Sequence, residues 1–329
     1  MIRFALASAL LALALLAAVL LPSSASAQAT DWPIKPVKFV SPFPPGGSVD
    51  PLARLVAVKM SEVFGQQFIV ENRTGASGSI GTAYVAKSAP DGYTYVFVFD
   101  THAVNPTLLP NLPYDTLKDL APVMLIGTSP MAITTSVTKP YKTFADVIAA
   151  AKARPGTITY GTIGAGSLGH LTMTLLQQAA GIELIHVPYK GGGPMTTDVL
   201  GGQIELAIAS VAQQGPHVRG GKLRAVAVTG NSRSPVLPDV PALAEQGFPG
   251  FSALAWWGIF APASVPKPIL DKFHAELVKV FNRPDVRKQL AETLGMDITA
   301  SSPEDTQKFL VSQIERWGKV VRDNNIRME

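Results

Sequence analysis

The segment richest in chemistry is a glycine- and proline-rich stretch that runs from Ser41 to Asp50. It follows an apolar run typical of a strand and precedes an amphipathic run typical of a helix, so it is predicted to be the loop between them. Gly46 and Gly47 let a bound molecule approach the backbone closely. The free N–H groups at the helix start, with the helix dipole, form an anion site that needs no charged side chain. In that hypothesis Asp50 caps the N-terminus of the helix and does not contact the ligand. The alternative is a tight turn capped by Ser48 or Asp50.

A second glycine-rich loop, Gly161–His170, also lies between a predicted strand and a predicted helix. Its residues 164–169 match the Gly-x-Gly-x-x-Gly pattern of dinucleotide-binding proteins, which expects an acidic residue about 20 positions later. The nearest acids, Glu183 and Asp198, fit that spacing poorly. Exported proteins also meet little nicotinamide cofactor, so we expect no cofactor.

The same loop offers a different chemistry, because Ser167 stands in a variant of the nucleophile elbow of secreted hydrolases. Asp198 and His217 follow it in the order of a catalytic triad. The required oxyanion loop has no clear candidate, since Gly191-Gly192-Gly193 comes after the serine instead of before it. A serine hydrolase using Ser167 is therefore the alternative hypothesis, against a binding protein that is not an enzyme.

Composition excludes several other classes. The chain has 28 basic and 24 acidic residues without a Lys/Arg cluster, so nucleic acid is not an expected partner. It has no cysteine, which removes lipid anchoring through Cys, thiol catalysis and Cys-based metal sites. The histidines lie far apart and lack the spacing of a zinc helix, so we expect no metal. They are His102, His170, His186, His217 and His274.

The first 27 residues have the three parts of a secretory signal peptide. Arg3 is positively charged, residues 4–21 are uncharged and mostly Ala and Leu, and Ala25-Ser26-Ala27 forms a small-residue cleavage site. The apolar run is near the length that spans a membrane, so a retained anchor is the alternative. No basic cluster follows as a stop-transfer signal, which favours cleavage before Gln28 and a freely soluble mature protein.

Short apolar runs alternate with amphipathic stretches, a pattern that predicts parallel α/β sheets. The strands are expected at residues 37–40, 68–70, 93–99, 124–126, 158–160, 183–186, 205–209 and 223–228, and Trp256-Trp257 is expected in a further buried strand. Helices are expected at residues 51–64, 143–153, 171–180 and 194–200. Thr143 and Asp146 resemble a capping box, and Pro268 and Pro303 open two more helices. Residues 268–325 are expected to be nearly all helical, without strands.

Two α/β halves without a flexible linker suggest domains joined by crossing strands around a cleft. The pattern does not place the crossings. Such clefts are common ligand sites, because the carboxyl ends of strands and the N-termini of helices converge there.

At this point the chain resembles a known family, the solute-binding receptors of tripartite tricarboxylate transporters, also called Bug-type proteins. The similarity covers essentially all of the mature chain, and its motifs are jointly highly specific. They are residues 42–48 (PFPPGGS), 70–76 (VENRTGA), 90–94 (PDGYT), 105–106 (NP), 112–115 (LPYD), 161–170 (GTIGAGSLGH), 186–191 (HVPYKG), 237–241 (LPDVP) and 317–321 (WGKVV).

The resemblance implies a periplasmic-binding-protein fold of type II-like architecture, with the ligand cleft between two α/β domains. Domain 1 would comprise residues 28–128 plus 253–329, and domain 2 residues 129–252. The ligand would be a small carboxylate: a carboxylic acid, an amino acid or an aromatic acid. The receptor would be a periplasmic monomer that delivers its ligand to a pair of membrane permease subunits.

The resemblance also implies which residues face the cleft. They are Phe43, Pro44, Gly46, Gly47, Ser48, Thr101, His102, Gly164, Gly166, Ser167, Gly169, His170, Pro188, Tyr189, Lys190 and Gly191. Two departures stand at strand ends expected to line it. Asp100 precedes Thr101 where similar proteins mostly have small residues, and Ser210 lies where many have an acidic or amide turn. Asp100 either selects a ligand with a positive or hydrogen-bond-donating group or caps its own turn.

Overall fold

The computed structural model describes residues 31–327, so the predicted signal peptide lies outside the described residues. The chain divides into a short unit, residues 1–34, and a large unit, residues 35–329. In the part of the chain that the structure describes, no helix combines the length and apolarity needed to cross a membrane.

The strands and helices alternate along most of this unit. The strands are β1 (Val37–Ser41), β2 (Phe68–Asn72), β3 (Thr94–Phe99), β4 (Leu120–Ser136), β5 (Thr159–Thr162), β6 (Ile185–Pro188), β7 (Leu206–Ser210), β8 (Leu223–Val228), β9 (Leu254–Pro262) and β10 (Asp297–Ile298). The α-helices are α3 (Val49–Phe64), α4 (Ser79–Ala86), α5 (Thr101–Leu108), α6 (Phe144–Ala153), α7 (Leu168–Ala180), α8 (Gly192–Leu200), α9 (Val211–Arg219), α10 (Lys267–Asn282), α11 (Pro284–Leu294) and α12 (Pro303–Asp323). Two short 3₁₀ turns, η1 (Ala76–Gly78) and η2 (Leu243–Gln246), complete them.

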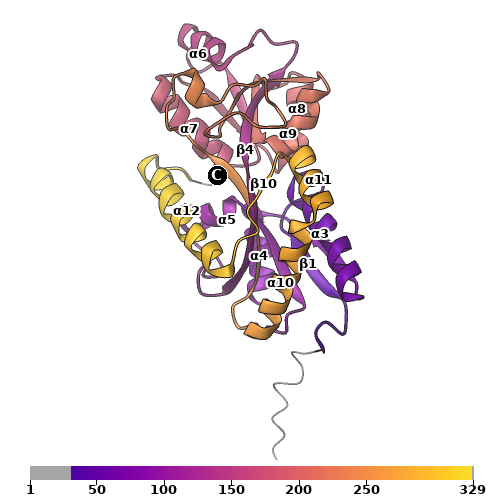
Figure 1. Ribbon diagram of the computed structural model, residues 1–329. Coiled ribbons are helices and arrows are strands. Elements are labelled where there is room, and N and C mark those ends of the chain that lie inside the picture. The colour runs from indigo at the N-terminus through magenta and orange to yellow at the C-terminus, as the bar shows by residue number, and fades with distance from the viewer. Residues whose placement is uncertain (1–30, 328–329) are drawn as a thin grey trace, which may run out of the picture. The chain divides into compact units, whose positions relative to one another are not determined.

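The strands form one continuous sheet in the order β2-β1-β3-β9-β4-β7-β5-β6, with β8 and β10 also paired to β4. The long strand β4 joins its two parts. Residues 120–130 of β4 pair with β9, and residues 131–136 pair with β7 and β8. We call the part built on β1, β2, β3, β9 and β10 the first lobe and the part built on β5, β6, β7 and β8 the second lobe. Figure 1 shows β4 running from one to the other.

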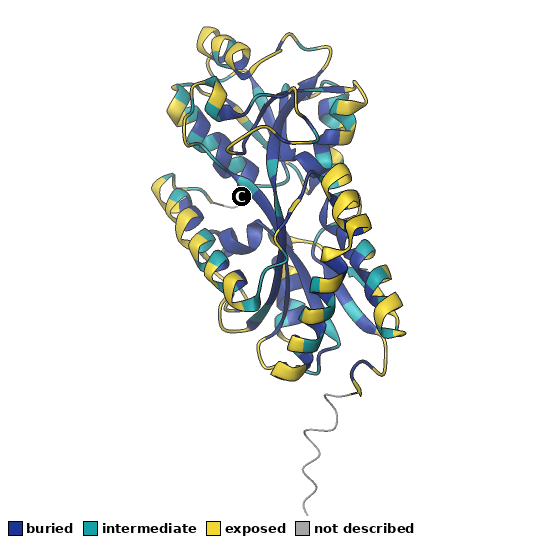
Figure 2. Ribbon diagram, viewed as in Figure 1, coloured by how far each residue is buried: buried dark blue, intermediate teal, exposed yellow. Residues whose placement is uncertain are grey.

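The inner strands are apolar along nearly their whole length because helices cover both faces of the sheet. In β1, Val37, Phe39 and Val40 are fully buried, and Phe39 packs against Phe97 and Phe273. The inner strands are buried and the edge strands β2 and β6 are partly exposed, whereas α10, α11 and α12 expose their outer faces (Figure 2). The strands therefore form a rigid base on which the loops at their ends are held.

Several local predictions are confirmed. Thr143 and Asp146 form a reciprocal capping box at the start of α6. Trp256 and Trp257 lie fully buried in β9. The prediction that residues 268–325 contain no strand is wrong, because β10 pairs Ile298 with Gly127 of β4. Its two residues are too few to give a periodic signal.

Candidate functional site

Helix N-termini of both lobes meet at the ends of the strands. Helix α3 follows β1 in the first lobe, and α8 and α9 follow β6 and β7 in the second. Residues from the first turns of all three, or from the loops before them, line the same two adjoining cavities. Each helix N-terminus presents backbone N–H groups without an intrahelical partner and a partial positive charge.

The larger cavity has a volume of about 330 Å³, and the smaller one, of about 30 Å³, shares Gly47, Ser48 and Gln213 with it. Together we call them the cleft cavity. Its described lining contains no Lys, Arg, Asp or Glu: Phe43, Pro44, Gly46, Gly47, Ser48, Val49, Pro51, Phe99, Ile163, Gly191, Gly192, Gly193, Thr196, Thr197, Leu200, Ala212, Gln213, His217 and Leu294. The cavity is thus electrostatically favourable to an anion through dipoles alone.

The N-termini of α3 and α8 are free to bind. Ser48 and Gly191 stand at the two N-cap positions, and neither makes a side-chain capping bond. The expectation that Asp50 caps α3 is wrong. Its carboxylate instead accepts hydrogen bonds from Arg54 and Asn72, and these hold its pKa below the usual value although desolvation, the largest single effect, raises it.

Two hydroxyl groups on the cavity wall are held as donors. The indole N–H of Trp257 donates to Ser48 Oγ at 3.2 Å, and because that N–H can only donate, Ser48 Oγ must accept. Thr196 Oγ1 accepts from the side-chain amides of Gln213 at 2.9 Å and Gln214 at 3.3 Å. In each case the hydroxyl proton remains available for another acceptor.

Two glycines let the walls of the cavity come together. A Cβ on Gly191 would lie 3.1 Å from Cγ of Pro44 in the first lobe, and the φ of Gly191 is +110°. A Cβ on Gly192 would lie 2.0 Å from the Gln213 side-chain nitrogen. Glycine is therefore favoured at 191 by backbone conformation and by contact between the lobes, whereas a side chain at 192 would have to displace the Gln213 amide.

The structure brings together one part of the residue set predicted from sequence. Phe43, Pro44, Gly46, Gly47, Ser48 and Gly191 line the cleft cavity. Thr101 and His102 lie with Phe43 around a narrow internal space that has no room for a water molecule. Pro188, Tyr189, Lys190 and Ser210 are not among the lining residues described for the cavity; Lys190 is exposed, and Ser210 is buried with no partner for its hydroxyl among the described residues.

The remaining predicted residues build the start of α7. The backbone N–H of Gly166 donates to His170 Nδ1 at 3.1 Å, and the N–H of His170 donates to Ser167 Oγ at 3.4 Å. The ring of His170 stacks on that of His186 with centroids 3.9 Å apart. Desolvation lowers the pKa of His170 to about 4 and that of His186 to about 3, so both rings are neutral at pH 7. With Gly164 and Gly169, these residues form a rigid turn.

This arrangement does not assemble a catalytic triad. Ser167 is buried and serves as the N-cap of α7. Asp198 instead accepts a hydrogen bond from the hydroxyl of Tyr189 at 2.7 Å, and His217 lies on the wall of the cleft cavity. Among the described residues, no three His, Cys, Asp or Glu side chains gather as a metal site.

Asp100 and His102, two first-lobe residues predicted to line the cleft, are deeply buried. Asp100 is 1% exposed, and desolvation raises the pKa of its carboxyl well above the usual value. His102 is 2% exposed, and desolvation lowers its pKa to about 3. Its ring lies 4.9 Å, between centroids, from that of Phe260. His102 is therefore a neutral core residue in this structure.

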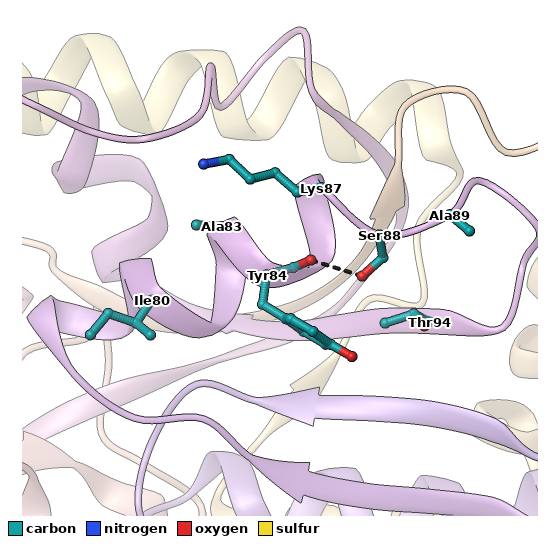
Figure 3. A pocket seen from close by; sticks show the side chains of 7 residues that line it. All are labelled: Ile80, Ala83, Tyr84, Lys87, Ser88, Ala89 and Thr94. Atoms are coloured by element: carbon teal, nitrogen blue, oxygen red, sulfur yellow. Dashed lines mark hydrogen bonds between the residues drawn. The ribbon is translucent and has the colours of Figure 1, made fainter.

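A separate cavity of about 510 Å³ lies on the first lobe around α4 (Figure 3). It shares no lining residue with the cleft cavity. Ser88 Oγ donates to the Tyr84 carbonyl at 2.8 Å, and Lys87 is the one charged residue of the seven that line it. All seven lining residues lie between β2 and the first residue of β3, so this cavity is formed by the first lobe alone.

Sequence reasoning missed 13 of the 19 lining residues, among them Ile163, Gly192, Thr196 and Gln213. Ile163 and Gly192 adjoin predicted positions, so loop neighbourhood could have found them. Gln213 stands in α9, a helix that was not predicted because Gly215 and Pro216 interrupt its pattern. No sequence signal distinguishes Thr196 from any other helical threonine.

Comparison with known proteins places this geometry in context. Residues 52–326 match the family model described as "Tripartite tricarboxylate transporter family receptor". Protein BugT of Bordetella pertussis is 35% identical over 308 residues, which cover 93% of this chain and 94% of BugT.

Solved structures are equally similar. Rpa4515 of R. palustris, solved with adipate, is 34% identical with a TM-score of 0.87 over 91% of this chain and all of that one. Periplasmic binding protein BugD is 31% identical with a TM-score of 0.85 over 91% of this chain and all of BugD. MatC of Rhodopseudomonas palustris, solved with malate, is 31% identical with a TM-score of 0.82 over 88% of this chain and all of MatC. The predicted periplasmic-binding-protein fold is confirmed, and nothing in the comparisons supports a serine hydrolase.

Proposed function

The chain belongs to the family of tripartite tricarboxylate transporter receptors, and on that premise we propose that it holds a small carboxylate in the cleft cavity. The family was expected from the sequence motifs, and its relatives are solute-binding proteins. Two of them were solved with carboxylates, adipate and malate. A carboxylate is the class of ligand that the cavity of this chain also favours.

One observation carries the proposal: the uncapped N-termini of α3 and α8 face one cavity whose described lining contains no Lys, Arg, Asp or Glu. A carboxylate there would accept hydrogen bonds from backbone N–H groups and from the hydroxyls of Ser48 and Thr196. Hydrogen bonds to an ionised acceptor contribute about 1.5–3 kcal/mol each, so a few of them suffice without a salt bridge.

The lobes are the second part of the proposal. Residues 28–128 with 253–329 and residues 129–252 would move as two bodies and close on the ligand, as domains of this kind commonly do. The contact between Pro44 and Gly191 is where the two would meet at the cavity. We expect a monomer, because a bilobed receptor completes its site within one chain.

Location and partners follow from the family and from the N-terminal sequence. We propose export to the periplasm with cleavage after Ala27, delivery of the ligand to a pair of membrane permease subunits, and no catalytic activity. Lack of covalent labelling of Ser167 by a fluorophosphonate probe would agree with a binding protein, and stoichiometric labelling would support the hydrolase instead.

The proposal is tested by a thermal-shift screen of the mature protein against mono-, di- and tricarboxylates and aromatic acids. A ligand at a hundredfold excess over its Kd stabilises a protein by about 2.7 kcal/mol, which is a readily measured shift. If at least one acid stabilises the parent and the same acid does not stabilise Gly191→Ala, binding occurs at the cleft. No shift with any acid would contradict the proposal.

A further inference from the structure

Four consecutive residues, Gly75 to Gly78, form a turn in which every φ is positive. The values are +126° for Gly75, +44° for Ala76, +54° for Ser77 and +85° for Gly78. Glycine adopts such a backbone readily, whereas a residue with a Cβ does so rarely and under steric strain. Other parts of the molecule must therefore hold Ala76 and Ser77 in this conformation. We call this segment the left-handed turn.

Buried polar side chains of two helices hold the left-handed turn. The carbonyl of Ser77 accepts hydrogen bonds from Thr101 Oγ1 at 2.9 Å and from Asn105 Nδ2 at 3.1 Å, both on α5. The carbonyl of Gly78 accepts one from Thr82 Oγ1 of α4 at 2.9 Å. All three donor residues are at most 3% exposed. The hydroxyl of Thr101, which the sequence predicts to face the cleft, instead anchors this turn.

The left-handed turn lies against the ring of Phe43. A Cβ on Gly78 would lie 3.0 Å from Cζ and 3.3 Å from Cε2 of that ring. The space that Phe43 bounds together with the turn and Thr101 has no room for a water molecule, so the ring cannot retreat into it. The ring also meets that of Phe99 edge to face, with centroids 6.1 Å apart. The carbonyl of Phe43 accepts a hydrogen bond from Asn72 Nδ2 at 3.0 Å, so both the backbone and the ring of Phe43 are fixed.

Phe43 and Phe99 also line the smaller part of the cleft cavity, which we call the small chamber. Its wall includes Val49 and Gly192, the first residues of α3 and α8, so both helix starts with free N–H groups lie at this chamber. Its volume is about 30 Å³. A buried water takes about 10–15 Å³, so the small chamber holds about two oxygen-sized groups. A planar carboxylate has two oxygens, whereas the tetrahedral head of a sulfonate or phosphonate has three.

We propose that Phe43, fixed by the left-handed turn, limits the small chamber to a planar carboxylate and makes this receptor reject sulfonates and phosphonates of the same chain length. A third oxygen would have to displace the ring, and a closely packed interior resists such overpacking. The discrimination then comes from a repulsive wall and not from an additional attraction. Thr101 and Asn105 act through the turn and are positioning residues that do not touch the ligand. The inference rests on the proposed function and names the head group that the same cavity accepts.

The test compares carboxylates with sulfonates of matched chain by calorimetry on the purified protein. The pairs are pentanoate with butane-1-sulfonate, adipate with butane-1,4-disulfonate, and phenylacetate with phenylmethanesulfonate. The parent is expected to bind the carboxylate of a pair about tenfold more tightly or better, the size expected for overpacking. Phe43→Leu shortens the wall and should remove most of this ratio, mainly by strengthening sulfonate binding.

Thr101→Val tests the support behind the ring, because valine has nearly the shape of threonine but cannot donate a hydrogen bond to Ser77. It should reduce the ratio about threefold, as expected when one hydrogen bond that holds the turn is lost. A purely structural role of Thr101 would lower the stability of the protein, measured by thermal unfolding, and leave the ratio unchanged. This variant also decides the question if Phe43→Leu does not fold.

Phe309→Leu is the matched control. Phe309 is a half-buried residue of α12 that also makes an edge-to-face contact, with Trp256 at 5.4 Å between centroids, and it does not line the cleft cavity. It should keep the parental ratio. A parent that binds the sulfonates as tightly as the carboxylates, or an unchanged ratio in folded Phe43→Leu or Thr101→Val, would overturn this inference and leave the proposed function standing. Binding of none of the three carboxylates by the parent would overturn both.

Discussion

Trp257 of β9 donates its indole N–H to Ser48 Oγ, the N-cap residue of α3, across 3.2 Å. The bond joins the strand that runs beside β4 to the loop with the strongest anion-binding character. Ser48 does not cap its own helix, because its backbone is αR (φ −81°, ψ −21°) and not in the extended conformation typical of an N-cap residue. Because Ser48 Oγ accepts the bond from Trp257, its proton is kept for a ligand.

Replacement of Ser48 by Ala should weaken carboxylate binding by about 1.5–3 kcal/mol, the usual contribution of a hydrogen bond to a charged acceptor. Calorimetry with the acid that gives the largest thermal shift measures it. Ser312→Ala, at an exposed serine of α12, is the control and should change the affinity little. Equal affinities of Ser48→Ala and the parent would remove Ser48 from the site.

Gly191→Ala should impair binding for two reasons, its φ of +110° and the 3.1 Å approach of a new Cβ to Pro44. Gly181→Ala separates the effect of backbone strain from the effect of the contact with Pro44. Gly181 also has a positive φ, +61°, but a Cβ there meets nothing within 4 Å. Both variants should lose about 1 kcal/mol of stability from backbone strain. Only Gly191→Ala should also lose affinity and, by small-angle scattering with ligand, show less compaction than the parent.

Lys190→Ala should reduce affinity by less than about 1 kcal/mol, the range of an exposed charge. Lys190 is exposed and does not line the cavity, although it is the basic residue nearest to the predicted loops. A loss of about 3 kcal/mol or more, the size expected when a buried charge loses its partner, would show a salt bridge to the ligand.

Asp100 should make the protein less stable as the pH rises. Because its folded-state pKa is raised by desolvation, the folded state holds its proton more tightly than the unfolded state does. The free energy of unfolding therefore falls with increasing pH above the unfolded-state pKa near 3.8, by up to about 1.4 kcal/mol per unit, until the folded-state pKa is reached.

Asp100→Asn removes this titration and should be more stable than the parent at pH 7, with the difference vanishing near pH 4. Thermal unfolding from pH 4 to pH 8 measures both. If Asp100→Asn is less stable than the parent by the same amount from pH 4 to pH 8, the carboxyl contributes to packing and its ionisation does not destabilise the folded state.

The first loop and its helix could be predicted because β1 and α3 each have a clear period and the glycines between them are sequential neighbours. The same holds for β5, the loop before α7 and its serine cap. Helices α5 and α9 could not be predicted, because Pro106, Gly215 and Pro216 interrupt their patterns and tertiary contacts hold them instead.

The partner groups across the molecule were also beyond prediction. The bond from Trp257 to Ser48 joins residues 209 positions apart, and the contact of Pro44 with Gly191 depends on how the loops meet. Sequence alone suggested that Asp100 either faces a ligand or caps its own turn. The structure places it in neither position, since it holds the N-cap site of α5 without a capping bond and does not line the cleft cavity.

The central claim is that neutral donors of the cleft cavity recognise a carboxylate. Calorimetry of the mature protein with the best acid of the screen and with the primary amide of that acid tests it most directly. The amide keeps the shape but has no negative charge for the N-termini of α3 and α8. We predict at least a hundredfold weaker binding of the amide in the parent. Equal binding of acid and amide, or binding of the acid that Ser48→Ala and Gly191→Ala leave unchanged, would contradict the account.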